Sequence, residues 1–241
     1  MILIQLLGCT HMESTLSDRE RAKLYLQMAA DQFAARQFAR SIETTEKALA
    51  VDPQFAPAYS HLGLIYMETK RYQKAEQAFA KAAELQPGYP DVQNNWGVLL
   101  NREERYDEAI AHFKAALRDD KYATPENALT NMGYAHYKLG QLAKAKLYHQ
   151  KALEVMPQFC LANKNLGDVY AKERNFGRAE EYFRKALASC PLYPEAHYKL
   201  AVAIMQSGNR RMAKSELQGL IDRYRHGPYV ERSQEILKYL R

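Results

Sequence analysis

The sequence lacks the residue patterns that indicate an enzyme or a metalloprotein. Its three cysteines, Cys9, Cys160 and Cys190, form no Cys-x-x-Cys pair, and there is no His-Glu-x-x-His motif, which disfavours a zinc site. It has no glycine-rich phosphate loop and no nucleophile elbow. Two histidines, His136 and His149, stand where the repeats described below carry aromatic residues, so we expect them to be packing residues. We therefore predict a protein that is not an enzyme and needs no cofactor.

The chain also lacks a long apolar segment and a long basic segment. No run of about 18 apolar residues occurs, so no transmembrane helix is predicted. The net charge is +6, but the 34 Lys and Arg residues are scattered among 28 Asp and Glu residues. This mixture disfavours nucleic acid as a partner. A well-solvated surface accounts for the charge most simply, and contact with an anionic partner such as a lipid headgroup layer is the alternative.

The sequence instead contains residue types that recur with a period of 34 residues. Small residues recur at Ala29, Gly63, Gly97, Gly133, Gly167 and Ala201. A second series consists of alanines, at Ala48, Ala82, Ala116, Ala152 and Ala186, and a third of prolines, at Pro53, Pro87, Pro157 and Pro191. A fixed period of this length indicates stacked copies of one structural unit.

Each of the six windows, which start at about residues 22, 56, 90, 126, 160 and 194, predicts a pair of helices. In the fifth window the first helix carries Leu166-Gly167 and Tyr170, and the second carries Ala179 and Phe183, at spacings that place them on one helical face. The small residue allows the two helices to approach closely, and a proline after the second helix ends it.

This pattern resembles the tetratricopeptide repeat family over residues 22–225. The resemblance implies an all-α fold, a right-handed superhelix (solenoid) of six helical hairpins. The first and last windows are weaker, as expected for end repeats that face solvent. Residues 229–240 predict one more amphipathic helix, so we expect residues 226–241 to form a C-terminal capping helix.

In such arrays the first helix of each hairpin lines a concave groove. The sixth position of the windows is mostly an amide, and it is occupied by Gln27, His61, Asn95, Asn131, Asn165 and Lys199. An Asn side chain both donates and accepts, so a ladder of Asn residues can pair with the backbone of an extended peptide. Nearby inward positions are apolar or aromatic, namely Phe33, Leu64, Met67, Val98, Tyr134, Tyr137, Val202 and Met205.

We predict that these residues, together with Asn94, form a groove that binds a peptide or a protein partner. The alternative is structural. The Asn residues would then solvate a helix face or bond a neighbouring helix, and the deeper apolar residues would belong to the core.

The first nine residues, MILIQLLGC, are apolar and end in a pattern that resembles a bacterial lipobox, Leu6-Leu7-Gly8-Cys9. A lipid on Cys9 would anchor the chain, because each buried methylene contributes about 0.8 kcal/mol. A secretory signal usually begins with positive charge, whereas here only eight residues precede Cys9 and none is Lys or Arg. We favour lipidation of Cys9, with residues 1–21 as a signal-peptide remnant, lipobox and polar tether and with a translation start upstream. An unprocessed apolar N-terminus is the alternative.

The other two cysteines open and close the fifth repeat. Cys160 and Cys190 therefore lie at the same end of one predicted hairpin, and in an oxidising periplasm they could form a disulfide. We expect instead two small residues that pack separately, with the disulfide as the alternative.

One repeat interval, from Gly97 to Gly133, is 36 residues long. Lys121 stands where a proline would close the third window, and we expect the next helix to open at Thr124 or Pro125. The link and its flanks carry a second set of motifs: Asn94-Asn95-x-Gly97, Arg105-Tyr106-x-Glu108-Ala109 and Asp120-x-Tyr122-x-x-Pro125-x-x-Ala128-x-x-Asn131-x-Gly133.

This set resembles the type IV pilus pilotins of the PilF, PilW and Tgl type, which are outer-membrane lipoproteins with six tetratricopeptide repeats. The resemblance implies a lipid-anchored protein on the periplasmic face of the outer membrane of a Gram-negative bacterium. Its partner would be the secretin subunit of the pilus, which it would help to localise and assemble, so that pili and twitching or gliding motility depend on it. The chain departs from the family at Val98-Leu99-Leu100, where the family often has Phe-Leu-Cys.

The rival hypothesis is a general tetratricopeptide scaffold or chaperone in the cytoplasm. Such a protein would carry no lipid and would bind an extended or helical peptide in the concave groove. A repeat protein that binds RNA would need a strongly basic inner face, which the mixed polar and apolar residues do not provide.

Overall fold

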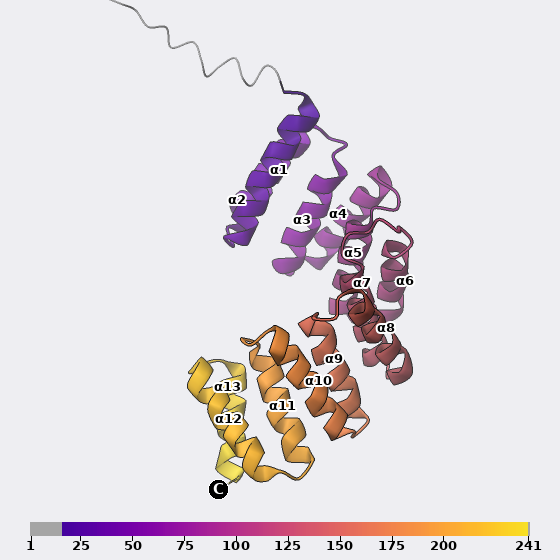
Figure 1. The fold of residues 1–241 in the computed structure, drawn as a ribbon. Helices are drawn as coiled ribbons and strands as arrows, with labels where there is room; N and C mark the ends of the chain where they lie inside the picture. Colours follow the sequence, from indigo (N-terminus) through magenta and orange to yellow (C-terminus); the bar gives the residue numbers. More distant parts are fainter. Residues whose placement is uncertain (1–15, 241) are drawn as a thin grey trace, which may run out of the picture. The chain divides into compact units, whose positions relative to one another are not determined.

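The computed structural model describes residues 16–240, and within them it contains thirteen α-helices and no strand (Figure 1). The all-α prediction is therefore confirmed. The predicted lipidation residue, Cys9, lies outside the described residues. The chain divides into two compact units, residues 1–104 and residues 105–241.

The first unit consists of helical hairpins that pack in chain order. Helix α1 opens with a capping box in which the Ser17 side chain accepts from the Glu20 amide and the Glu20 carboxylate accepts from the Ser17 amide. Helices α1 and α2 pack as one hairpin and α3 and α4 as the next, and α5 packs on α4. The helices are α1 (Asp18–Ala34), α2 (Phe38–Val51), α3 (Ala56–Glu68), α4 (Tyr72–Leu85) and α5 (Pro90–Arg102).

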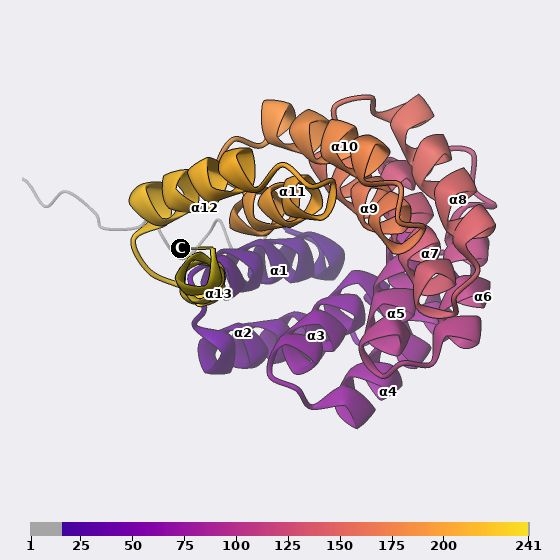
Figure 2. The ribbon, with the colours of Figure 1, turned by 90° about the horizontal axis from the view of Figure 1, so that it is seen from below.

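The second unit repeats this arrangement and adds a final helix. Its helices are α6 (Tyr106–Ala116), α7 (Pro125–Lys138), α8 (Leu142–Val155), α9 (Cys160–Lys172), α10 (Phe176–Ser189), α11 (Pro194–Gln206), α12 (Arg210–Tyr224) and α13 (Pro228–Tyr239). Within this unit α9 and α11 lie on the inner side of the stack and α10 and α12 on the outer side (Figure 2). Helix α7 contacts α9, α9 contacts α11, and α13 packs on α12 and α11.

Proline and residues of positive φ define the ends of the helices. Helices α5, α7, α11 and α13 have proline in the first turn. Backbone N–H groups there have no acceptor within the helix, so the absence of the N–H in proline costs no hydrogen bond. The turn inside a hairpin contains one residue in the left-handed region. It is Lys70 between α3 and α4, with φ of 59°, and Gly140 between α7 and α8, with φ of 75°. One such residue reverses the chain within a short loop, so the paired helices lie antiparallel.

A small residue on the first helix packs against an aromatic ring on the second. Phe79 and Phe183 are almost completely buried in this position. A Cβ atom built on Gly167 would lie 2.5 Å from the ring of Phe183, and Gly63 faces Phe79 in the same way. Only glycine permits this approach, and burying each phenylalanine contributes about 2–3 kcal/mol.

In the hairpin of α7 and α8 the ring is a histidine. His149 is fully buried, and a Cβ on Gly133 would lie 2.6 Å from its Cε1 atom. Neither ring nitrogen has a hydrogen-bond partner. Burial, with a smaller contribution from the positive charge of Lys164, lowers the pKa of His149 from 6.5 to about 3. His136 is also buried and stacks on Tyr148, so both histidines are packing residues as expected.

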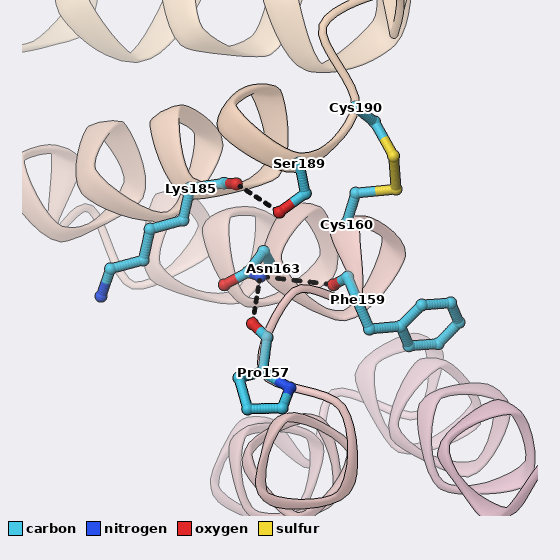
Figure 3. Close-up of a disulfide and its surroundings, with 7 residues drawn as sticks. All are labelled: Pro157, Phe159, Cys160, Asn163, Lys185, Ser189 and Cys190. Carbon is cyan, nitrogen blue, oxygen red and sulfur yellow. Dashed lines mark hydrogen bonds between the residues drawn. A yellow bond between two sulfur atoms is a disulfide. The ribbon is translucent and has the colours of Figure 1, made fainter.

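Cys160 and Cys190 form a disulfide, and the expectation that they pack separately is wrong (Figure 3). Their Cα atoms lie 6.0 Å apart, within the range that a disulfide spans. Cys160 is the first residue of α9 and Cys190 follows the last residue of α10, so the bond closes the open end of this hairpin. Asn163 stabilises the adjacent turn by donating to the carbonyl oxygens of Phe159 and Pro157, at 3.3 and 3.5 Å.

The glycine contact predicts opposite effects for two glycine-to-alanine substitutions. Gly167→Ala should lower the free energy of unfolding by about 1–3 kcal/mol, because the new methyl group overlaps the Phe183 ring. Gly219→Ala in α12 meets no atom within 4 Å and should raise it by up to about 1 kcal/mol through helix propensity. Urea denaturation followed by circular dichroism measures both. Equal effects would show that the close approach does not limit stability.

His149 predicts a loss of stability in acid. The unfolded chain binds a proton as the pH falls through 6.5, whereas the folded chain binds it only near pH 3. The free energy of unfolding should therefore fall between these two values, by up to about 1.4 kcal/mol per pH unit. Between pH 7 and pH 5 the wild type should lose about 2 kcal/mol more than His149→Phe. Parallel pH profiles of the two proteins would contradict the assignment.

The disulfide should stabilise the fold by restricting the unfolded chain. For cysteines 30 residues apart, the Cys160→Ser, Cys190→Ser double variant should be less stable by about 3–4 kcal/mol. A reducing agent should lower the stability of the wild type to that of the variant and leave the variant unchanged. Peptide mapping by mass spectrometry without reduction should recover the linked pair. Alkylation of both cysteines in the unreduced protein would show that the bond is absent.

Candidate functional site

The inner helices of the first unit enclose a groove of about 530 Å³. It lies along α1, α3 and α5, and it brings together four predicted groove residues, Gln27, His61, Leu64 and Asn95. Gln27 is exposed and donates to Asp31 at 3.3 Å, and Asn95 is half-buried and accepts from Asn94 at 3.4 Å. The amide groups therefore lie beside apolar carbon in one concavity, as the groove prediction requires.

His61 is fixed by a polar contact that the sequence did not reveal. Its Nε2 atom lies 3.1 Å from the hydroxyl of Ser41, which itself donates to the carbonyl of Ala29 at 2.7 Å. Because the single hydroxyl proton goes to Ala29, the histidine Nε2–H donates to Ser41. The ring meets Phe33 edge-on at 5.6 Å, and burial lowers the pKa of His61. A neutral, oriented imidazole therefore forms part of the groove floor.

A second, smaller cavity of about 340 Å³ lies at the turn between α1 and α2. Three predicted residues, Phe33, Leu64 and Met67, line it together with Phe38. Met67 is only 4% exposed, and Val98 on α5 packs against the same hydrophobic core. The apolar residues at these positions are thus partly core and partly lining.

The second unit has its own groove of about 450 Å³, bordered by α9, α11 and α13. Three predicted residues, Tyr137, Lys199 and Val202, line it. Asn165 is only 6% exposed, whereas Asn131 is half-buried and Tyr134 is exposed. Met205, the last of the predicted residues, packs against the core formed by α10, α11 and α12.

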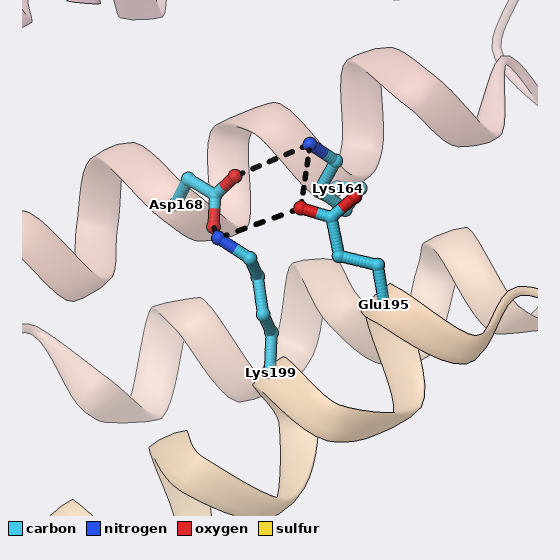
Figure 4. Close-up of polar contacts among 4 residues, drawn as sticks. All are labelled: Lys164, Asp168, Glu195 and Lys199. Atoms are coloured by element: carbon cyan, nitrogen blue, oxygen red, sulfur yellow. Dashed lines mark hydrogen bonds and ion pairs between the residues drawn. The ribbon is translucent and has the colours of Figure 1, made fainter. Parts of the chain in front are cut away.

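Four charged side chains form a cluster at this groove, and sequence reasoning identified only Lys199 among them. Lys199 lies 2.6 Å from Asp168 and 3.6 Å from Glu195, and Lys164 lies 3.4 Å from both carboxylates (Figure 4). Burial lowers the pKa of Lys199, but the charge and hydrogen bond of Asp168, with Glu195, raise it above its ordinary value. The sequence did contain a signal for this cluster. Lys164 and Asp168 on α9, and Glu195 and Lys199 on α11, are pairs of opposite charge four residues apart on successive inner helices.

Tyr229 and Arg232 were also missed as lining residues, because the sequence suggested only a capping role for the helix that carries them. Among residues 16–240, no three His, Cys, Asp or Glu side chains are placed to hold a metal ion. None of the helices in that range has the length and apolar character needed to cross a bilayer. What the described surfaces offer is amide, aromatic and charged groups in concave grooves, which suits binding.

Comparison with known proteins agrees with this arrangement. The tetratricopeptide repeat family matches residues 88–158 through one profile and residues 26–90 and 164–223 through another. The type IV pilus assembly protein PilF of Pseudomonas aeruginosa is 27% identical over 137 residues, which are 57% of this chain and 54% of that protein. Tetratricopeptide repeat protein 6 of Homo sapiens is 26% identical over 213 residues, or 74% of this chain and 41% of that protein. The chain thus spans about half the length of these two relatives.

Solved structures match over a greater length. The crystal structure of PilW, described as a widely conserved type IV pilus biogenesis factor, superposes with a TM-score of 0.82 at 27% identity, covering 90% of this chain and 98% of that one. The structure of Pseudomonas aeruginosa PilF gives 0.78 at 21% identity with the same coverage and supports the fold alone. The chain belongs to the tetratricopeptide repeat family and is homologous to PilF and PilW, repeat proteins of type IV pilus biogenesis.

Proposed function

We propose that this protein is a pilotin, which localises the secretin subunit of the type IV pilus to the outer membrane and assists its assembly. The observation that carries the proposal is the match to PilW, which extends over 98% of that chain at 27% identity. Similarity at this level along nearly the whole length exceeds what a shared repeat alone requires, since other repeat proteins match over a smaller part of their length or at lower identity.

The grooves support a role in binding a protein. Each is concave and lined by apolar or aromatic carbon with a few polar groups, the combination that typically binds an extended or helical segment. We infer that the repeats bind secretin, and that the predicted groove residues Gln27, His61, Asn95 and Lys199 contribute to the contact.

Two features of different kinds support the location that we propose. Cys9 follows a lipobox-like sequence, and a lipid there would hold the protein at the membrane. The disulfide between Cys160 and Cys190 supports an oxidising compartment, because such bonds form and persist in the periplasm and are rare in the cytosol. We therefore propose that the protein lies on the periplasmic face of the outer membrane.

A deletion strain of the native bacterium, complemented with variants, tests both parts of the proposal. Deletion should leave secretin as monomers and remove surface pili, and the wild-type gene should restore heat-resistant secretin multimers on immunoblots. Cys9→Ser should remove the protein from the outer-membrane fraction and abolish labelling by a fatty-acid probe. Thr10→Ser, which keeps the cysteine, serves as the matched control.

The outcomes separate the two parts. Normal secretin multimers in the deletion strain would refute the pilotin function and favour a general repeat scaffold. Equal labelling of Cys9→Ser and wild type would refute the lipid anchor while leaving the secretin function open to the multimer assay.

A further inference from the structure

The groove of the second unit is closed by a helix that the repeat pattern does not require. Helix α13 packs on α11 and α12, and two of its residues, Tyr229 and Arg232, line the cavity of about 450 Å³. The opposite wall comes from α9 and the preceding inner helix, through Lys172 and Tyr137. The final helix therefore turns an open repeat surface into a three-sided pocket.

The charge cluster, three of whose members line the pocket, is internally balanced. Lys164 and Lys199 supply two positive charges, and Asp168 and Glu195 supply two negative ones (Figure 4). Each carboxylate lies within 3.6 Å of both ammonium groups, and Lys164 is 8% exposed. Asp168 and Glu195 are thus already engaged, and they leave the charge of other cations at the pocket uncompensated.

Two such cations border the pocket. Lys172 lies over the ring of Tyr137, 4.6 Å from its centroid, and Arg232 lies over the ring of Tyr229, at 5.6 Å. Both are exposed, and neither forms an ion pair with a carboxylate in the described part of the chain. An aromatic face orients a cation without neutralising it. The pocket therefore presents two oriented positive charges that can accept a negatively charged group.

Apart from these charged residues and Gln206, the lining is apolar and aromatic. Phe176, Val202 and Ala203 contribute carbon surface, and Tyr198 contributes a ring. A cavity of this size accommodates one or two side chains and is in the range of ordinary ligand pockets. A group that fills it would place its apolar part against these residues and its charged part near Lys172 and Arg232.

We propose that this pocket binds a segment of a partner protein in which an apolar or aromatic side chain lies next to an Asp or Glu. Lys172 and Arg232 bind the carboxylate, and the guanidinium of Arg232 can do so in a bidentate manner. The pocket walls bind the apolar side chain. The proposal rests on the protein-binding function proposed above, and it is independent of whether that partner is secretin.

A protein segment fits this geometry better than a membrane surface does. A membrane presents a flat layer of headgroups, whereas the two cations stand at a concave pocket with an apolar interior. A side chain that projects from a peptide backbone can enter such a pocket while its neighbour pairs with the rim. Helix α13 contributes both the ring of Tyr229 and Arg232, so it determines specificity in addition to ending the array.

A random dodecamer phage library, selected on the purified full-length protein, supplies the test peptide. Peptides selected on the wild type should carry Asp or Glu within three residues of a large apolar side chain. Fluorescence anisotropy should show at least tenfold weaker binding of a selected peptide to Lys172→Gln, Arg232→Gln. The matched control is Lys151→Gln, Arg211→Gln, which removes the same charge outside the pocket, Lys151 also lying over a tyrosine ring. It should bind as the wild type does.

Charge reversal distinguishes contact from a structural effect. Lys172→Glu, Arg232→Glu should lose the acidic peptide and gain binding of a version in which Lys replaces each Asp and Glu. Equal binding by the Gln variant and its control, or selected peptides without acidic residues, would overturn the proposal. If no peptide is selected, the Gln variant is tested for binding to phosphatidylglycerol vesicles and for self-association. Loss of either in that variant would overturn the proposal, because the two cations would then contact a membrane or a second copy of the chain. Failure of the secretin assay alone would leave these measurements unaffected.

Discussion

The close approach of two helices at a small residue is the contact on which the hairpin packing depends, and that residue is glycine in the hairpins of α3 with α4, α7 with α8 and α9 with α10. Gly167 lies against the ring of Phe183 at a distance that leaves no room for a Cβ atom, and Gly63 lies against Phe79 in the same way. The ring fills the space between the helices, and the alanines of the second helix, such as Ala186, are fully buried beside it. Because the two helices are locked in one register, every hairpin presents the same positions of its first helix to the inner side.

The binding surfaces are a consequence of that register. Equivalent positions on α1, α3 and α5 line the groove of the first unit, and equivalent positions on α9 and α11 line the groove of the second. Within each groove these positions are more than thirty residues apart in the sequence. Because these positions line a groove, packing does not restrict them to apolar residues. They can therefore carry the amide, tyrosine and charged side chains that a partner contacts. The hairpin of α7 and α8 has His149 where two other hairpins have a phenylalanine, and the histidine ring is fully buried in the same place between the helices.

The fold was predictable because its determinants are local and repeated. Pro90 and Pro125 mark helix starts, and Gly167 and Phe183 are separated by the same number of residues as Gly63 and Phe79. Binding in the groove stays a prediction, and the structure gives only where its proposed residues lie. Tyr137, Lys199 and Val202 line the groove of the second unit, whereas Asn165 and Met67 are both buried. Periodicity tells which face a residue occupies, but its depth on that face depends on the bulk of neighbours from other hairpins.

What the sequence did not reveal depends on contacts made once in the chain. Ser41 stands where later repeats have an alanine, such as Ala75 and Ala179, and its pairing with His61 joins α2 to an inner helix of the next repeat. The disulfide requires that the two ends of one hairpin come within 6.0 Å, which the spacing of Cys160 and Cys190 permits without requiring. No repeated pattern encodes such contacts, because the other copies lack the partners.

In the second unit, two such contacts, the disulfide and the charge cluster, act on the helices that form the pocket. The disulfide ties the first residue of α9 to Cys190, and a short turn leads from Cys190 into α11. Helix α9 carries Lys164 and Asp168, and α11 carries Glu195 and Lys199, so the covalent bond joins the two segments whose charges interlock. The bond and the two ion pairs that cross between the helices, Lys164–Glu195 and Lys199–Asp168, hold α9 and α11 at one relative position, and α13 packs against α11. A binding pocket needs fixed walls, and here restraints that the repeat pattern does not provide hold α9 and α11, two of the helices that form those walls.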